Sequence, residues 1–226
     1  MNTRTTTGTT ILSAEGELID FKNNQFEKYK VASIPLETCD GIVKFLDTLD
    51  LKWEEGKVRD VEVDYKVRRS DIAWVDDSDL KEFVWSQFVS ANKSDPDWCF
   101  DIDSIEDIQY TVYKLSPTPD DSNPLAAQSG HYEWHNDIVM SVDDNQVIPN
   151  KTRKLSMTIV LNDGYEGCDF ECGSVKKGDL IGEKVPLKKG DVLVFPSMMH
   201  HRVHPCLLYT SPSPRDRTRS RMQSSA

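Results

Sequence analysis

The chain has 226 residues, with 38 acidic and 27 basic side chains and a formal net charge of −11. This length suits one domain with a sizeable core, and 38% hydrophobic with 29% charged residues is typical of a globular protein. The acidic balance disfavours a nucleic-acid backbone or an anionic membrane as partner, because both require a basic surface. The net negative charge does not exclude a small local basic groove.

The cysteines and the N-terminus bear on location. Five cysteines have no framework spacing, which is typical of a reduced, intracellular protein. The first residues lack the apolar core of a signal peptide, and no apolar run is long enough to span a membrane. We therefore expect a soluble, cytoplasmic protein.

The first hundred residues predict a mixed region. Residues 1–25 are polar and rich in Thr, and we expect a flexible N-terminus. Residues 29–34 predict a strand, and a helix follows from Pro35 to Leu49 with apolar residues at helical spacing. The alternating, β-branched stretch 61–75 predicts another strand. Ser78 is the predicted cap of a second helix.

From Ile105 onwards, short strands separated by Gly, Pro, Asp and Asn predict a sandwich, barrel or jelly roll. The fold class is therefore mainly β with flanking helices (α+β). A long loop, 116–130, interrupts the pattern and is expected to be a functional lid or an insert. The predicted strands cover 108–115, 131–139, 153–162, 168–172, 181–187, 191–196 and 201–205.

A metal site is predicted from three residues. His135 and Asp137 stand two apart in a predicted strand, so both side chains point to the same face. His201 is the candidate third ligand. Two imidazoles and one carboxylate on one face of an ion leave positions open for substrate and oxygen, as in non-haem Fe(II) oxygenases. Taken alone, the His-x-Asp pair is equally explained by a surface His and a turn Asp.

Three other histidines compete for roles. Strand alternation places His200 and His204 on the face opposite to His201, where they are polar surface groups or support the ligands indirectly. His131, four residues before His135 on the same face, is either at the mouth of the site or exposed. Cys168 and Cys172 form a weak alternative metal pair, because no further Cys or His lies near them.

The wider pattern resembles a known family. GHYEWHND, RKLSMTIVLNDGYEGCDFE and KKGDVLVFPSMMHHRVHP resemble, in order and spacing, the catalytic domain of prolyl 4-hydroxylase-like Fe(II)- and 2-oxoglutarate-dependent oxygenases, over residues 105–205. YKVRRSDIAWV is similar to the preceding strand in small bacterial and phage-type members. The resemblance implies a double-stranded β-helix, or jelly-roll, barrel. It also favours His201 as the distal ligand, because that ligand precedes Arg-Val in the family.

The resemblance also implies a function. We expect a dioxygenase that uses Fe(II), 2-oxoglutarate and O2, with ascorbate as a candidate reductant, to hydroxylate an unactivated C–H on a protein or peptide side chain. The alternatives are a hydroxylase of a free amino acid or small metabolite, and a non-catalytic jelly-roll metal-binding module. Tyr113 aligns with a tyrosine of the 2-oxoglutarate pocket, and Thr158 and Asn162 are weaker candidates for contacts with this co-substrate.

The C-terminal segment 206–226 has a different character. Cys206 to Asp216 and the residues after them resemble the translation of a sequencing-library adaptor, so we expect a non-native tail after an oxygenase domain at 26–205. The family anchors the distal carboxylate of 2-oxoglutarate with an Arg or Lys about ten residues after the distal His. This position falls near Ser211, so the chain is expected to lack both the anchor and the last strand of the barrel.

Overall fold

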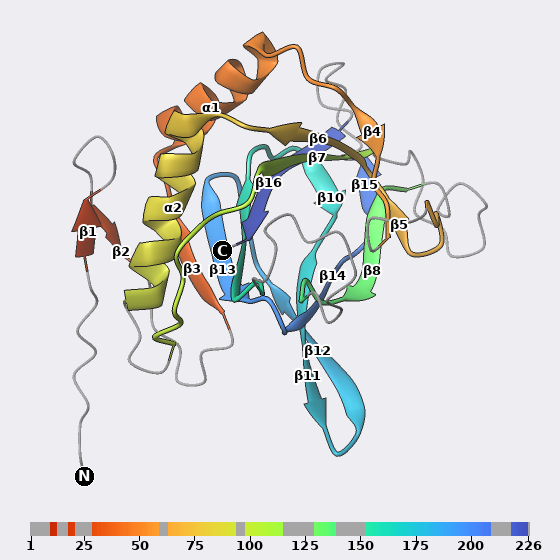
Figure 1. Ribbon diagram of the computed structural model, residues 1–226. Coiled ribbons are helices and arrows are strands. Elements are labelled where there is room, and N and C mark those ends of the chain that lie inside the picture. Colours follow the sequence, from red (N-terminus) through yellow and green to blue (C-terminus); the bar gives the residue numbers. More distant parts are fainter. Residues whose placement is uncertain are drawn as a thin grey trace.

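The computed structural model of the chain describes residues 10–12, 18–20, 29–58, 63–93, 98–114, 129–138, 152–208 and 218–225. Two antiparallel sheets dominate it (Figure 1). The seven-stranded sheet has the order β3 (Lys30–Ser33), β13 (Asp191–Pro196), β9 (Leu155–Val160), β16 (Thr218–Ser225), β7 (Ile108–Lys114), β6 (Asp71–Val75) and β4 (Glu54–Glu55).

The five-stranded sheet has the order β12 (Asp179–Val185), β11 (Phe170–Lys176), β14 (His200–Val203), β8 (His131–His135) and β5 (Arg68–Arg69). Two small sheets pair β10 (Tyr165–Gly167) with β15 (Cys206–Leu208) and β1 (Thr10–Leu12) with β2 (Leu18–Asp20). This mainly β, jelly-roll arrangement with two flanking helices confirms the predicted fold class.

Side-chain alternation on the strands builds two cores. On β13, Val192 and Val194 face the helices α1 (Leu36–Thr48) and α2 (Ser78–Lys93), which cover one face of the seven-stranded sheet (Figure 1). Leu193 and Phe195, on the other face, join Phe170 of the five-stranded sheet in a second core. Because side chains of a strand point alternately to opposite faces, one strand serves both cores.

The strand β9 shows the same division and positions polar groups inside. Leu155, Met157 and Ile159 belong to the helix-side core. Ser156 and Thr158, which alternate with them, are fully buried on the opposite face, between the two sheets. A polar side chain buried at this place needs a partner there, so β9 marks the interior in which a site can lie.

Both predicted helices are present, but the cap of the second differs from the prediction. The helix α2 begins at Ser78, and the backbone N–H of Leu80 donates to the carboxylate of Asp77 at 2.9 Å. Asp77, rather than Ser78, is therefore the residue that satisfies the first free amides. The prediction was one residue late because both residue types cap helices equally well.

The predicted strand 61–75 is wrong as a single element. Residues 65–67 form a turn, in which the Asp64 carboxylate accepts from the backbone N–H of Lys66 and the Asp64 carbonyl accepts from that of Arg68. The short strands β5 and β6 follow, and they pair with β8 and β7 in different sheets. The local hydrogen bonds of an Asp in a turn outweigh the alternation that indicated a strand.

The tail contributes two strands, which differs from the prediction that the barrel lacks its last strand. The strand β16 lies between β7 and β9, with Met222 buried in the helix-side core, and β15 pairs with β10. The sequence TRSRMQSS can pair here without a hydrophobic pattern, because the edges of β7 and β9 offer free backbone groups to any extended segment. The position near Ser211 lies outside the described residues.

The predictions for the cysteines, for residues 1–25 and for the loop 116–130 are confirmed only in part or lie outside the described residues. Cys168 and Cys206 form a disulfide, which differs from the expectation of reduced cysteines, while Cys39, Cys99 and Cys172 are thiols. Within 1–25, the described residues form the β1–β2 hairpin. All but the last two residues of the predicted loop 116–130 lie outside the described part. No helix among the described residues is long and apolar enough to cross a membrane.

Candidate metal centre

The two histidines of the predicted site lie on neighbouring strands. His135 is the last residue of β8, and His201 is directly opposite it in the register with β14. Their ring centroids are 4.1 Å apart, with a tilt of 58°. Antiparallel pairing thus brings together two residues that are far apart in the sequence, on the same face of the five-stranded sheet.

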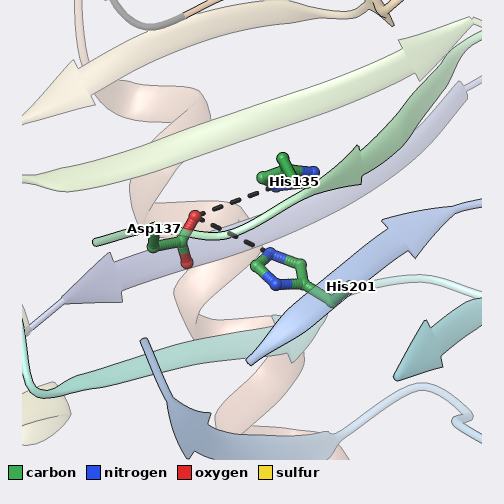
Figure 2. A group of neighbouring side chains, drawn as sticks. All are labelled: His135, Asp137 and His201. Atoms are coloured by element: carbon green, nitrogen blue, oxygen red, sulfur yellow. Dashed lines mark ion pairs between the residues drawn. The ribbon is translucent and has the colours of Figure 1, made fainter. Parts of the chain in front are cut away.

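Asp137 completes the group from just beyond the strand. β8 ends at His135, earlier than predicted, and the Asp137 N–H donates to the carbonyl of Ser197 at 2.9 Å. The Asp137 Oδ1 atom lies 3.8 Å from Nε2 of His135 and 3.7 Å from Nε2 of His201 (Figure 2). The ligand atoms of the three residues all lie within 4.8 Å of one another, so one ion can contact all three.

Backbone hydrogen bonds orient both imidazoles toward this point. The Nδ1 atom of His135 is 2.7 Å from the Glu133 carbonyl, and that of His201 is 3.0 Å from the Met199 carbonyl. A carbonyl can only accept, so Nδ1 carries the proton and Nε2 presents its lone pair. Metal-binding histidines are held in this tautomer by the same kind of contact.

The protonation states also suit a cation. Burial lowers the pKa of His135 to about 3, and the neighbouring His201 adds to the effect against the attraction of Asp137. Burial raises the pKa of Asp137, but the two histidines, a hydrogen bond from Ser156 and the charge of Arg153 together hold it below its ordinary value. At neutral pH the site therefore offers a neutral His135 ring and a carboxylate.

The fit of a metal rests on His201. Its side chain is 1% exposed, and among the described residues its Nε2 atom has no hydrogen-bond partner. A buried polar atom without a partner is costly, and a cation shared with Asp137 and His135 would satisfy it. Two nitrogens and one carboxylate oxygen are a donor set that suits Fe(II) with open positions.

Aromatic rings support the site from the sides. His201 packs against Phe170, whose stacked ring centroid is 5.3 Å away, and against Phe195, whose ring centroid is 4.6 Å away. Tyr132 stacks on His135 with centroids 3.5 Å apart. These contacts fix the ring positions and keep water from the sides of the ligands. These roles of Phe170 and Phe195 were not predicted. Strand alternation nevertheless places Phe170 on the same face of its sheet as His201, and Phe195 on the same face as Leu193.

The other histidines lie elsewhere. His204 contacts the carboxylate of Glu171, which also accepts from Nε of Arg202 at 2.6 Å. Glu171 and Arg202 are register partners on the face opposite to His201, so His204 belongs to that face, as alternation predicts. His131 is buried, and its Nδ1 lies 2.9 Å from the Ser129 carbonyl. It is thus a structural group rather than an exposed one.

The three residues predicted to contact 2-oxoglutarate differ in position. Tyr113 is fully buried in the second core, together with Phe170 and Phe195. Thr158 is buried on the interior face of β9, and among the described residues its hydroxyl has no hydrogen-bond partner. Asn162 lies two residues beyond the C-terminal end of β9. Six residues of extended chain, about 20 Å, separate it from Ser156. The structure thus brings Tyr113 and Thr158 into the interior, but not Asn162.

Comparisons with known proteins agree on the fold. No family model and no curated protein matches the sequence. Among solved structures, a Pseudomonas putida prolyl 4-hydroxylase superposes with a TM-score of 0.59 at 15% identity, covering 88% of this chain and 92% of the other. The chain has the prolyl 4-hydroxylase fold.

Two further structures extend this agreement. A Trichoplax adhaerens prolyl hydroxylase, solved with a peptide fragment of the hypoxia inducible factor oxygen degradation domain, gives a TM-score of 0.58 at 13% identity, with 88% and 83% of the chains covered. The structure of OsALKBH1 gives 0.52 at 13% identity, with 91% and 99% covered. At such identities the shared feature is the prolyl 4-hydroxylase-like jelly roll, and the function must be argued from the site.

Proposed function

We propose that the protein is an Fe(II)- and 2-oxoglutarate-dependent dioxygenase that hydroxylates an unactivated C–H bond of a protein or peptide side chain. One observation carries the proposal. His135, Asp137 and His201 converge within 4.8 Å inside a prolyl 4-hydroxylase-like fold, with both Nε2 atoms facing the carboxylate. The solved Trichoplax relative contains a peptide, which supports a peptide substrate for this chain.

In this proposal, His135, Asp137 and His201 hold the iron. When bound there with 2-oxoglutarate and O2, Fe(II) supplies the oxidising chemistry that inserts one oxygen atom into a C–H bond, while 2-oxoglutarate becomes succinate and CO2. The residues of the chain supply position. The carbonyls of Glu133 and Met199 hold the imidazole tautomers, the Ser197 carbonyl holds the backbone of Asp137, and the Ser156 hydroxyl helps to keep the pKa of Asp137 low.

We propose that the co-substrate binds on the interior side of the two sheets. Tyr113 and Thr158 point into the space between the sheets, and both carry hydroxyl groups suited to a carboxylate. Phe170 and Phe195 exclude water beside His201, which strengthens electrostatic interactions there. We propose a cytoplasmic location for this activity, with ascorbate as the reductant that keeps iron in the Fe(II) state.

The proposal is tested by succinate formation. The chain is incubated with Fe(II), 2-oxoglutarate and a proline-containing peptide library, and succinate and a mass gain of one oxygen are measured. The matched variants are His201→Ala and His200→Ala, adjacent residues on opposite faces of β14. We expect succinate from the wild type and from His200→Ala but not from His201→Ala.

A second form of the chain separates the tail from the site. The natural sequence after Pro205 is restored, and both forms are compared for succinate formation. Because the position near Ser211 is expected to carry the anchor of 2-oxoglutarate, we expect faster turnover in the restored form. Absence of iron-dependent succinate from both forms contradicts the proposed function, whereas equal turnover contradicts only the role assigned to the missing anchor.

A further inference from the structure

A buried arginine lies next to the metal centre without a counter-ion. The side chain of Arg68 on β5 is buried, with 5% of the residue exposed. Its guanidinium donates to the Ser70 hydroxyl at 2.9 Å, to the Lys57 carbonyl at 3.2 Å and to the Gln109 side-chain oxygen at 2.7 Å. All three acceptors are neutral, and no carboxylate among the described residues pairs with Arg68. Burying a charge without a counter-ion is costly.

Arg68 forms part of the wall of a cavity of about 110 Å³. The cavity is lined by residues around the β4, β5 and β6 strands and the end of β7, namely Glu55, Gly56, Tyr65, Arg68, Arg69, Ser70, Asp71 and Lys114. Drug-sized ligands occupy about 300–1,000 Å³, so this cavity accepts one small group rather than a whole ligand. None of the three candidate metal ligands lines it.

Three cationic side chains, Arg68, Arg69 and Lys114, and two carboxylates, Glu55 and Asp71, line the cavity, so its wall carries one positive charge in excess. Of the two carboxylates in the wall, Asp71 pairs with Lys114 at 2.7 Å, and Glu55 accepts from the Tyr65 hydroxyl. The guanidinium has five N–H groups, of which three have the neutral acceptors named above. One N–H group on each Nη atom remains for a further acceptor, and a carboxylate is the acceptor that a guanidinium binds most strongly.

The backbone is shaped to admit this guanidinium. A Cβ atom added at Gly56 would lie 2.5 Å from Nε of Arg68 and 2.4 Å from the Ser70 hydroxyl. Only a residue without a side chain therefore fits beside the guanidinium in this position. Gly56 is also held in place, because its N–H donates to the Ser70 carbonyl at 2.8 Å.

Two stacked rings connect the cavity to the metal centre. The Arg68 guanidinium lies 4.6 Å from the centre of the Tyr132 ring, and Tyr132 stacks on His135 at 3.5 Å. Register pairing fixes the arrangement, because Arg68 is opposite Tyr132 in the β5–β8 pair. Only the Tyr132 ring thus separates the Arg68 guanidinium from His135, a candidate iron ligand.

We infer that Arg68 and its cavity form a subsite for a carboxylate of the substrate, so that the enzyme selects a target residue with an acidic side chain close to it. This inference rests on the proposed function and names the substrate class of the same site. Tyr113 and Thr158, the interior candidates for the co-substrate, do not line this cavity. The subsite is therefore separate from the place proposed for 2-oxoglutarate.

The test measures binding to the full chain without turnover. N-acetyl-aspartate amide and its neutral isostere N-acetyl-asparagine amide are titrated, by NMR, into wild type, Arg68→Met, Arg68→Lys and the control Lys184→Gln, whose exposed ion pair with Asp169 lies on another face. We expect the acidic amide to bind roughly tenfold or more tightly than the neutral one in wild type and control. Arg68→Met should remove this preference, and Arg68→Lys should retain part of it.

The outcomes separate the possible roles of Arg68. Equal binding of the two amides by wild type, or a preference that survives in Arg68→Met, overturns the inference. 2-Oxoglutarate is titrated in the same series, and a loss of its binding in Arg68→Met with an unchanged preference for the acidic amide would assign Arg68 to the co-substrate instead. Because no iron is present, these results do not depend on whether the succinate assay succeeds.

Discussion

The two large sheets of this protein are built for different tasks. The seven-stranded sheet carries both helices and an apolar core that includes Leu46, Phe88 and Ile108. The five-stranded sheet carries the candidate iron ligands His135 and His201, polar groups whose positions are costly without a partner. The seven-stranded sheet and its helices thus supply stability, and part of this stability offsets the cost of holding buried polar ligands on the five-stranded sheet.

The largest expected effect is the loss of metal binding in a variant that still folds. His201→Ala should reduce Fe(II) affinity by more than about a hundredfold, since even residues that only orient a ligand contribute 10–100-fold. The metal-free variant should lose less stability than Phe88→Ala does, because the cavity left beside Phe170 and Phe195 is partly offset by the removal of a buried nitrogen that has no hydrogen-bond partner among the described residues. Equilibrium metal binding and calorimetry measure the two quantities. A large loss of stability without metal would contradict the division.

A substitution in the helix-side core should have the opposite result, a loss of stability without a loss of metal affinity. Phe88 on α2 is fully buried in the helix-side core, so Phe88→Ala should lower the free energy of unfolding by about 3–5 kcal/mol. Metal affinity of the molecules that remain folded should not change. Denaturant unfolding gives the first quantity, and Val175→Ala, at a residue that is 64% exposed, is the control, with an expected change within about 0.5 kcal/mol.

A smaller effect sharpens the boundary between the two regions at β9. The Ser156 hydroxyl is among the groups that hold the pKa of Asp137 below its ordinary value, so Ser156→Ala should weaken metal binding by up to about 10–100-fold. Thr158→Val, two residues along on the same face, should leave metal affinity unchanged. If both variants bind metal as the wild type does, the hydrogen bond from Ser156 does not position Asp137.

The smallest effect concerns the outer face of the five-stranded sheet. Arg202 and His204 lower the pKa of Glu171 below its ordinary value of 4.5, although burial acts in the opposite direction. A carboxyl whose pKa is lowered by folding stabilises the protein above pH 4.5, and this contribution disappears as the pH falls through the folded-state pKa. Glu171→Gln should therefore cost about 1–3 kcal/mol at pH 7 and progressively less as the pH falls below 4.5. A pH-independent difference in unfolding free energy would contradict this account.

The sequence predicted the fold class, both helices and most strands of the two large sheets, because alternation and helical spacing indicate which face is buried. In the part of the chain that the structure describes, the two sheets do not close into a barrel. It also brought His135, Asp137 and His201 together as a candidate site, through family resemblance as well as spacing. Local turn chemistry at Asp64 was missed because a turn and a strand share the same residues there. Arg68 was missed for a different reason. That it pairs with no carboxylate among the described residues is a property of three-dimensional packing, which no spacing in the sequence indicates.

The tail shows a further limit of sequence reasoning. Its composition predicted a segment outside the fold, whereas residues 218–225 fill the place between β7 and β9. Strand pairing uses backbone groups that every residue except proline carries, so a segment without an evident hydrophobic pattern can still complete a sheet.

X-ray absorption at the iron edge of the anaerobic, Fe(II)-loaded protein tests the central claim most directly, because it counts the rings bound to iron. We predict outer-shell scattering from two imidazoles in the wild type and in His200→Ala, and from at most one in His135→Ala and His201→Ala. Two imidazoles in all four proteins, or none in the wild type, would contradict the claim that these two histidines hold the metal together with Asp137.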